Sequence, residues 1–305
     1  MVIPFNEMLR SAQFKFIISN GNQNTVVVVH ASAIAATCDY MNQLINGAMA
    51  EAQEASAEIK DINFDDFVRF CEYAYRGDYT VPTWTLDESN VSQKPSEPRE
   101  GEFQTSFVQH LAAETFRPPP PTPVEDDVLV VVDNPQIITT PSHTGRKKNK
   151  KTLKRTRFKN RNYSVPEPPI GIITAGFEPD ANNHPTQNFT PVFLAHAHLY
   201  KFAHLRLIEP LKALALKKLK WTLMNFKLYE RRLGDILELA RYAYNDIDIP
   251  PRTESGKIDD LRSLVVEFIA CEIDTIGKSK ELSELLEDGG EFASDLWRRV
   301  HPLLS

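Results

Sequence analysis

The apolar residues of this 305-residue chain are regularly spaced in two separate stretches, and the segment between the stretches shows no such spacing. The first stretch covers residues 1–83, and the second runs from Phe189 to residue 305. The middle, residues 84–188, contains four consecutive prolines at 118–121 and a dense basic tract. Such a segment cannot bury enough apolar surface to offset the entropy lost on ordering. We therefore predict two folded parts, 1–83 and 189–305, that pack together, with a mostly disordered insert between them.

The first stretch begins with the pattern of a β-hairpin. Residues 14–18 and 25–29 are rich in strand-favouring side chains, and Asn20-Gly21-Asn22 between them is a turn signal. The alanine-rich residues 31–44 favour a helix, and residues 59–62 indicate a short strand. Strands followed by helices predict an α+β arrangement for this part of the chain.

A further helix is predicted to begin after Asn63. This residue is a good N-cap, because its side chain accepts a hydrogen bond from a backbone N–H of the first turn. Four apolar side chains then follow at i, i+3, i+4 and i+7, which places them on one buried face. They are Phe67, Phe70, Cys71 and Ala74. Gly77 closes the predicted helix.

The second stretch contains three apolar stripes with helical spacing. Pro210 suits the first turn of a helix, where its missing N–H would be unpaired in any case. Each stripe must be buried against another element, so we expect several helices packed together and against the first part. The stripes are Leu211, Leu214, Ala215 and Leu219; Leu233, Ile236, Leu237, Ala240 and Tyr244; and Leu261, Leu264, Val265, Phe268 and Ile269.

The charge is distributed unevenly along the chain. Residues 146–161 hold ten Lys or Arg and no acid, so removing their +10 from the net charge of −6 leaves −16 on the rest. This balance excludes a globally basic nucleic-acid binder and leaves a local basic tract.

Cys38, Cys71 and Cys271 are widely spaced and form no CxxC pair, so neither a disulfide framework nor a zinc site is indicated. Together with the absence of a secretory pattern and of long apolar runs, this predicts the nucleus or cytoplasm and no membrane contact.

Two segments carry a resemblance to a known family. VVVVHASAIAA, starting at Val26, is a strand that leads into a histidine-led helix start. FVRFCEYAYRGDY, starting at Phe67, has an aromatic-rich end. The motif positions are His30, Ile34, Tyr73, Tyr75 and Tyr79. In order and spacing, residues 14–82 resemble the BTB/POZ family. The resemblance implies a small mixed sheet flanked by helices, a role in binding other proteins, and homodimers as a candidate assembly.

The later part of the chain is similar to the BTB proteins of filamentous fungi. The similar segments are HAHLYKFA at residues 196–203, LKALA at 211–215, and GGEF at 289–292. In those proteins the helices continue the BTB fold directly. The resemblance therefore implies an all-α C-terminal region that packs on the BTB-like domain, with the insert interrupting the continuity.

The tripeptide Met49-Ala50-Glu51 matches the hydrophobic-x-Glu loop by which some BTB proteins dock a cullin ubiquitin-ligase scaffold. In such a loop an exposed apolar side chain fills a shallow pocket, and the carboxylate fixes its orientation. The competing interpretation is a solvated loop without a partner. The resemblance makes a substrate adaptor for a cullin-type ligase one candidate function.

The basic tract suggests a second function. Tracts of this kind are read by nuclear import receptors or bind phosphates of nucleic acid. The candidate nuclear-localisation residues are Arg146, Lys147, Lys148, Lys150, Lys151, Lys154, Arg155 and Arg157. Only Phe158 could stack on a base, so nucleic-acid contact is less favoured than import, and a solvated linker is the third interpretation. The alternative function is therefore a nuclear regulatory protein that uses the basic tract at 146–161 to contact nucleic acid or chromatin partners.

An apolar run within the insert resembles a SUMO-interacting motif. Acidic residues flank Val128, Leu129, Val130 and Val131 on both sides. Such a run adds a strand to an exposed sheet edge of SUMO, and its acids meet a basic rim. The rival interpretation is an extra strand on the protein's own sheet.

No catalytic motif is present, because the sequence lacks GxSxG, GxxxxGK[ST], GxGxxG and HExxH patterns. His196, His198 and His204 have no metal-ligand spacing, and we expect them on the surface or partly buried on a helix. Trp221 and Trp297 are interpreted as core or interface anchors. The sequence thus predicts a non-enzymatic protein-interaction scaffold or adaptor without metal or cofactor.

Overall fold

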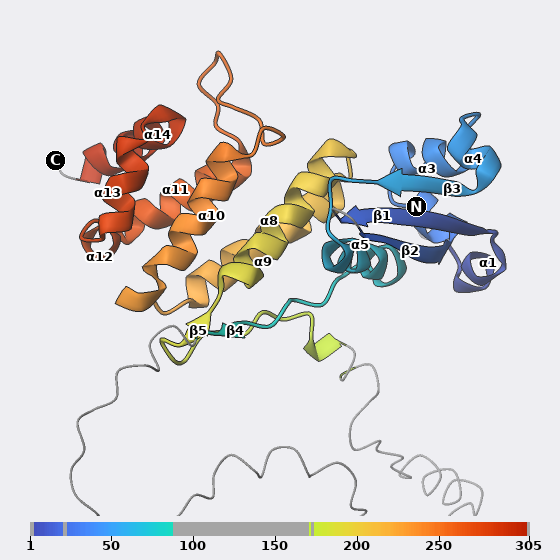
Figure 1. The fold of residues 1–305 in the computed structure, drawn as a ribbon, viewed down its shortest axis with the longest axis horizontal. Helices are drawn as coiled ribbons and strands as arrows, with labels where there is room; N and C mark the ends of the chain where they lie inside the picture. The colour runs from blue at the N-terminus through green and yellow to red at the C-terminus, as the bar shows by residue number, and fades with distance from the viewer. Residues whose placement is uncertain (1–2, 21–22, 88–170, 172–173, 304–305) are drawn as a thin grey trace, which may run out of the picture. The chain divides into compact units, whose positions relative to one another are not determined.

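The computed structural model describes residues 3–20, 23–87, 171 and 174–303. The chain divides into two units, Met1–Ser92 with Pro166–Ser305, and Gln93–Val165. All described residues belong to the first unit, whose N-terminal part contains a sheet with short helices and whose C-terminal part is helical (Figure 1). This order of elements confirms the predicted α+β class with an all-α C-terminal region.

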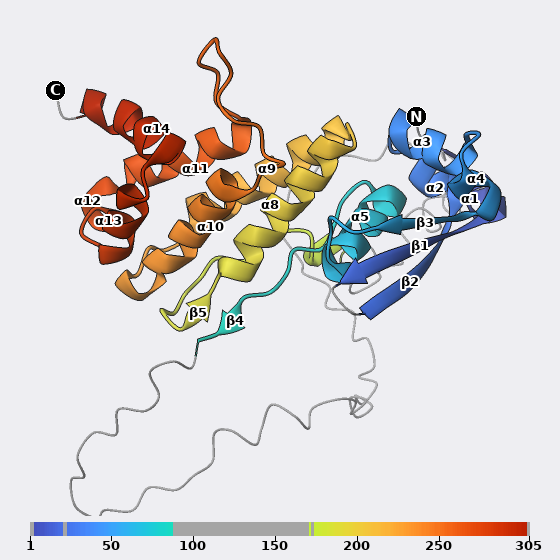
Figure 2. The same ribbon diagram turned by 45° about the horizontal axis from the view of Figure 1, so that its top comes forward.

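The N-terminal sheet has three strands, β1 (Gln13–Asn20), β2 (Gln23–His30) and β3 (Ser56–Ile59), in the order β2-β1-β3. β1 and β2 form the predicted antiparallel hairpin, and β3 pairs with β1 in parallel, so the sheet is mixed. Figure 2 shows β1 between the two edge strands, β2 and β3. Alternate residues of β1 point into the core, where Phe14, Phe16 and Ile18 are almost fully buried. The strand expected at 59–62 ends at Ile59, earlier than predicted.

The helix predicted over residues 31–44 is two helices, so that prediction is wrong in detail. α2 (Ala31–Ala35) ends where Thr37 Oγ1 donates a hydrogen bond to the Ile34 carbonyl at 2.7 Å. α3 (Asp39–Asn46) begins after Cys38, whose sulfur accepts from the Met41 N–H at 3.4 Å. Side chains that bond to the backbone in this way compete with a continuous helix.

The other N-terminal helices are α1 (Phe5–Arg10), α4 (Ala50–Glu54) and α5 (Phe64–Arg76). The prediction for α5 is confirmed at both ends. Asn63 Oδ1 accepts from the Asp66 N–H at 2.9 Å, which caps the first turn. Gly77 has a φ of 76°, the left-handed conformation that ends helices.

The C-terminal part is built from helices, and the three predicted stripes lie on α9, α10 and α11. The elements are α8 (Thr190–Leu205), α9 (Glu209–Asn225), η1 (Glu230–Arg232), α10 (Leu233–Asn245), α11 (Asp260–Cys271), α12 (Ile273–Ile276), α13 (Lys280–Glu287), α14 (Gly290–Val300) and η2 (His301–Leu303). No helix among the described residues combines the length and the apolar character needed to span a bilayer.

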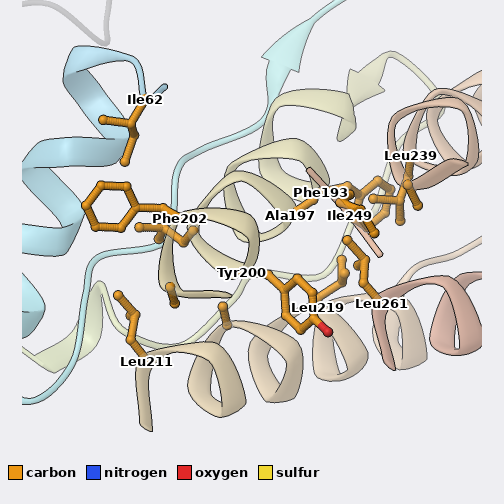
Figure 3. Packing of buried hydrophobic residues seen from close by; sticks show 14 of the residues in the cluster. Ile62, Phe193, Ala197, Tyr200, Phe202, Leu211, Leu219, Leu239, Ile249 and Leu261 are labelled. Carbon is orange, nitrogen blue, oxygen red and sulfur yellow. The ribbon is translucent and has the colours of Figure 1, made fainter. Parts of the chain in front are cut away.

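The two parts share one hydrophobic core, and α8 lies at their junction between α5 and α10 (Figures 1 and 2). The ring of Phe202 on α8 lies 4.9 Å from that of Phe70 and 6.4 Å from that of Phe67, both on α5. Figure 3 shows Phe202 directed toward Ile62, and Tyr200 directed away from it, toward Leu219. The two apolar faces of α8 therefore hold the N-terminal and C-terminal parts together.

Both ends of the predicted insert contain described residues that pack on this unit. β4 (Thr85–Leu86) pairs antiparallel with β5 (Gln187–Asn188). The Val81 N–H donates to the Gly176 carbonyl at 2.9 Å. Phe177 and Asn182 are buried. Described residues on both sides of the insert boundaries at 83 and 189 thus pack together.

Candidate partner-binding surfaces

The Met49 loop joins α3 to α4. Met49 is the N-cap residue of α4, its backbone is extended, and half of its surface is exposed. Glu51 lies in the first helical turn, where a carboxylate is favoured by the helix dipole. Its side chain makes no hydrogen bond or ion pair with any other residue in the described ranges. An apolar side chain and an unpaired carboxylate, two residues apart, are thus both available to a partner.

The turn before this loop is tightly constrained. The Gly47 N–H donates to the Gln43 carbonyl at 2.9 Å and ends α3. A Cβ at position 47 would lie 2.2 Å from that carbonyl oxygen, so no larger residue fits without a backbone shift. After the turn, the Ala52 N–H donates to the Met49 carbonyl at 3.2 Å. Met49 is therefore presented from a fixed backbone rather than from a long free loop.

A second surface is an open groove of about 750 Å³ along the outer face of α5. Its apolar lining includes Phe5 from α1 with Phe64 and Val68 from α5, and these are 66%, 38% and 42% exposed. Charged side chains of both signs surround them: Asp65, Arg69, Glu72 and Arg76. Exposed apolar residues within a charged rim are typical of protein-interaction sites. This groove was not predicted from the sequence, although the i, i+4 pair Phe64 and Val68 on α5 was a signal for it.

The five motif positions are mainly structural. Tyr75 Oη accepts the His30 backbone N–H at 2.8 Å and lies 2.9 Å from His30 Nδ1, so it fixes the step from β2 to α2. Ile34 and Tyr79 are fully buried, and Tyr73 packs against the core. Of these residues, Tyr75 also lines the groove. The motif therefore builds the domain that presents the two surfaces.

His196 was expected on the surface or partly buried, and that expectation is wrong. It is fully buried, and its Nδ1 lies 2.7 Å from Tyr79 Oη. Burial, with Lys218 and Arg69 nearby, lowers the pKa of His196 to about 3. Its imidazole is therefore neutral near pH 7, and its partner was not visible locally because Tyr79 lies 117 residues earlier.

His198 is half-buried, and its Nδ1 lies 2.7 Å from Asp66 Oδ2. Asp66 is buried and also accepts from Arg69 at 2.8 Å. Within the described residues, no group of three His, Cys, Asp or Glu side chains could hold a metal ion. The hydrogen bonds among His198, Asp66 and Arg69 therefore link α5 to α8.

The two tryptophans interpreted as anchors are not in the core. Trp221 is 40% exposed and Trp297 is 60% exposed, so the core interpretation is wrong and only the interface interpretation stays open.

The basic tract at 146–161 and the apolar run Val128, Leu129, Val130 and Val131 lie outside the described residues. Both therefore stay sequence-based predictions.

The comparisons with known proteins concern the N-terminal part. A family model described as BTB/POZ domain matches residues 5–93, which include the Met49 loop and the α5 groove. Neither a curated protein nor a solved structure matches the chain. The match covers the three-stranded mixed sheet and helices α1 to α5, in the arrangement that the sequence resemblance implied. Residues 5–93 are therefore a BTB/POZ domain, a domain of the protein-interaction class.

Proposed function

We propose that the chain is a non-enzymatic adaptor that uses the Met49 loop of its BTB/POZ domain to bind a cullin-type ubiquitin-ligase scaffold. The observation that carries the proposal is the half-exposed Met49 at the N-cap of α4, with the unpaired Glu51 carboxylate in the first turn of the same helix. A shallow pocket on a partner can bind the apolar Met49 side chain, and a contact to the Glu51 carboxylate then fixes the orientation. In this proposal the α5 groove, which is open among the described residues, binds a second protein.

The test is direct binding of the full chain to a purified cullin N-terminal domain, measured by calorimetry. We expect the wild type to bind and Met49→Ala/Glu51→Ala to lose at least about tenfold in affinity, because the apolar anchor and its orienting charge are removed together. Glu54→Ala is the matched control, since Glu54 is an exposed acid on the same helix and outside the motif. Absence of binding by the wild type, or equal affinity of the double variant, would refute the cullin role.

The basic tract supports a second candidate, a nuclear regulatory role. Its ten Lys or Arg within 16 residues, without an acid, are typical of segments read by import receptors. The test is the distribution of a fluorescent fusion in which Arg146, Lys147, Lys148, Lys150 and Lys151 are changed to Gln. Loss of nuclear accumulation supports the proposal, and an unchanged distribution rejects it.

The run at 128–131 supports SUMO as a further candidate partner, through strand addition. A labelled peptide of residues 122–136 titrated with SUMO decides this. Saturable binding that is abolished by Val130→Asp supports it, and binding that is equal for both peptides rejects it.

A further inference from the structure

One face of α9 remains exposed although the opposite face is fully packed. Leu211, Ala215 and Leu219 point into the core and are at most 1% exposed. On the other side, Trp221 is 40% exposed and Met224 is 72% exposed. Lys217 lies one turn before Trp221, and Lys220 lies one turn before Met224, so the four side chains share one surface of the helix. With Lys227 just beyond the helix end, we call these residues the lysine–tryptophan face.

The lysines of this face are unpaired. Residues 210–229 contain five lysines and no acid. One of them, Lys218, is buried and bonded, and Lys212 lies over the Tyr200 ring at 5.3 Å. Lys217, Lys220 and Lys227 are exposed, and no carboxylate within the described ranges lies within 4.0 Å of their ammonium groups. Three cations thus surround two exposed apolar side chains.

The position of the face is fixed by buried contacts. The Asn182 side chain is 1% exposed and makes hydrogen bonds to both the N–H and the carbonyl of Lys227. Its Oδ1 accepts the Lys227 N–H at 2.5 Å, and its Nδ2 donates to the Lys227 carbonyl at 2.8 Å. Phe226, between this lysine and the helix, is buried against Phe189 and Phe193. The face is therefore preorganised, which lowers the entropic cost of binding.

We infer that the lysine–tryptophan face binds an acidic protein segment that carries an apolar anchor residue. The three unpaired ammonium groups attract carboxylates of a partner, because residues 210–229 supply no carboxylate of their own. Trp221 and Met224 supply the apolar contact, and tryptophan is among the residues that contribute most to protein interfaces. The inference goes beyond the proposed BTB-mediated binding, because the face lies on a C-terminal helix outside residues 5–93.

A protein segment fits this face better than a nucleic acid or an anionic membrane. The described residues hold 22 Lys or Arg and 31 Asp or Glu, so their net charge is 22 − 31 = −9, and they repel an extended polyanion beyond the local lysines. A short acidic segment meets only the local lysines, since charges more than about 8 Å away are largely screened at physiological salt. The face also offers a single exposed aromatic ring, whereas single-stranded nucleic acid is bound by several stacking rings in a basic groove.

The test is selection of binding peptides on the immobilised full chain from a displayed library of random peptides. We expect enrichment of peptides that combine Asp or Glu with an aromatic or branched aliphatic residue. One enriched peptide is then titrated against three variants. Lys217→Glu/Lys220→Glu should weaken binding at least about tenfold, because two attractions become repulsions. Trp221→Ala should also weaken it, through the lost apolar contact.

The control is Lys257→Glu/Lys278→Glu, which changes the net charge equally at two other exposed lysines. It should bind as the wild type does, and circular dichroism should show all variants folded. Selection of peptides without acids, or equal binding by both double variants, would overturn the inference. So would binding of an oligonucleotide or of phosphatidylserine vesicles that is lost only in Lys217→Glu/Lys220→Glu, since the face would then serve another class of ligand.

Discussion

α8 and α9 lie side by side, yet solvent reaches them very differently. Nine of the 16 residues of α8 are buried, against six of the 17 residues of α9, so α8 is covered on more than one side. α8 packs on α5 and α10 as well as on α9, whereas no element in the described part of the chain covers the lysine–tryptophan face of α9. A helix that is apolar around most of its circumference belongs in the interior, and a helix with a single stripe leaves a surface for partners.

Both helices nevertheless place one polar side chain against the same residue. His196 of α8 meets the Tyr79 hydroxyl at 2.7 Å. Lys218 of α9 donates to the Tyr79 carbonyl at 2.8 Å, and its ammonium lies 4.4 Å from the centre of the Tyr79 ring. Tyr79 is part of the BTB motif, so both helices bond to the BTB/POZ domain. The comparison therefore predicts strong effects for buried positions on either helix and weak ones for the exposed face of α9.

The largest effect is expected for Phe202→Ala on α8. The Phe202 side chain is fully buried between Phe67 and Phe70, and the Arg206 guanidinium lies 3.9 Å from the centre of its ring. Truncation removes this contact and leaves a cavity at the junction of the two parts, which typically costs about 3–5 kcal/mol. Urea unfolding followed by circular dichroism measures the change in the free energy of unfolding.

The matched change on α9 is Met224→Ala, which also removes an apolar side chain from a helix. Because Met224 is 72% exposed, we expect a change within about 0.5 kcal/mol. Similar losses for the two variants would contradict the assignment of α8 to the interior and of this face of α9 to the surface.

The sequence predicted what depends on local spacing. The hairpin, the capped helix after Asn63 and the stripes on α9, α10 and α11 follow from neighbours a few residues apart. The break between α2 and α3 was missed because the Cys38 sulfur, besides capping α3, donates to the Arg206 carbonyl at 3.2 Å, 168 residues later. Of the candidate sites, the Met49 loop was predicted from three adjacent residues. The α5 groove and the lysine–tryptophan face were not, because finding them requires knowing which helix faces are covered.

A smaller but still clear effect is expected for Lys218→Met. The Lys218 ammonium is buried, lies 2.6 Å from Asp78 Oδ1, and donates to the carbonyls of Tyr79 and Phe177 at 2.8 and 2.6 Å. Methionine keeps the apolar stem but leaves the carboxylate and two carbonyls without their donor. Because Asp78 is partly exposed and can be hydrated, we expect a loss of about 2–3 kcal/mol rather than more.

Lys217→Met is the control for this loss, since Lys217 is the exposed neighbour and makes no ion pair with the described residues. Its change should stay within about 0.5 kcal/mol. If both variants unfold at the same urea concentration, the bonds of Lys218 contribute no net stability.

The smallest of the three effects depends on pH and concerns the buried His196 of α8. The pKa of His196 is lowered to about 3 in the folded chain and is near 6.5 when unfolded. Between these values only the unfolded state binds the proton, so stability is complete above about pH 6.5 and falls as the pH drops. From pH 6.5 to 5 the loss is about 2 kcal/mol, at about 1.4 kcal/mol per pH unit.

Tyr79→Phe/His196→Leu removes the titrating ring and its partner together. Over this pH interval the free energy of unfolding of this variant should therefore fall by about 2 kcal/mol less than that of the wild type. The exposed His301→Gln should keep the wild-type slope, and equal slopes for all three proteins would show that the buried ring of α8 does not couple folding to protonation.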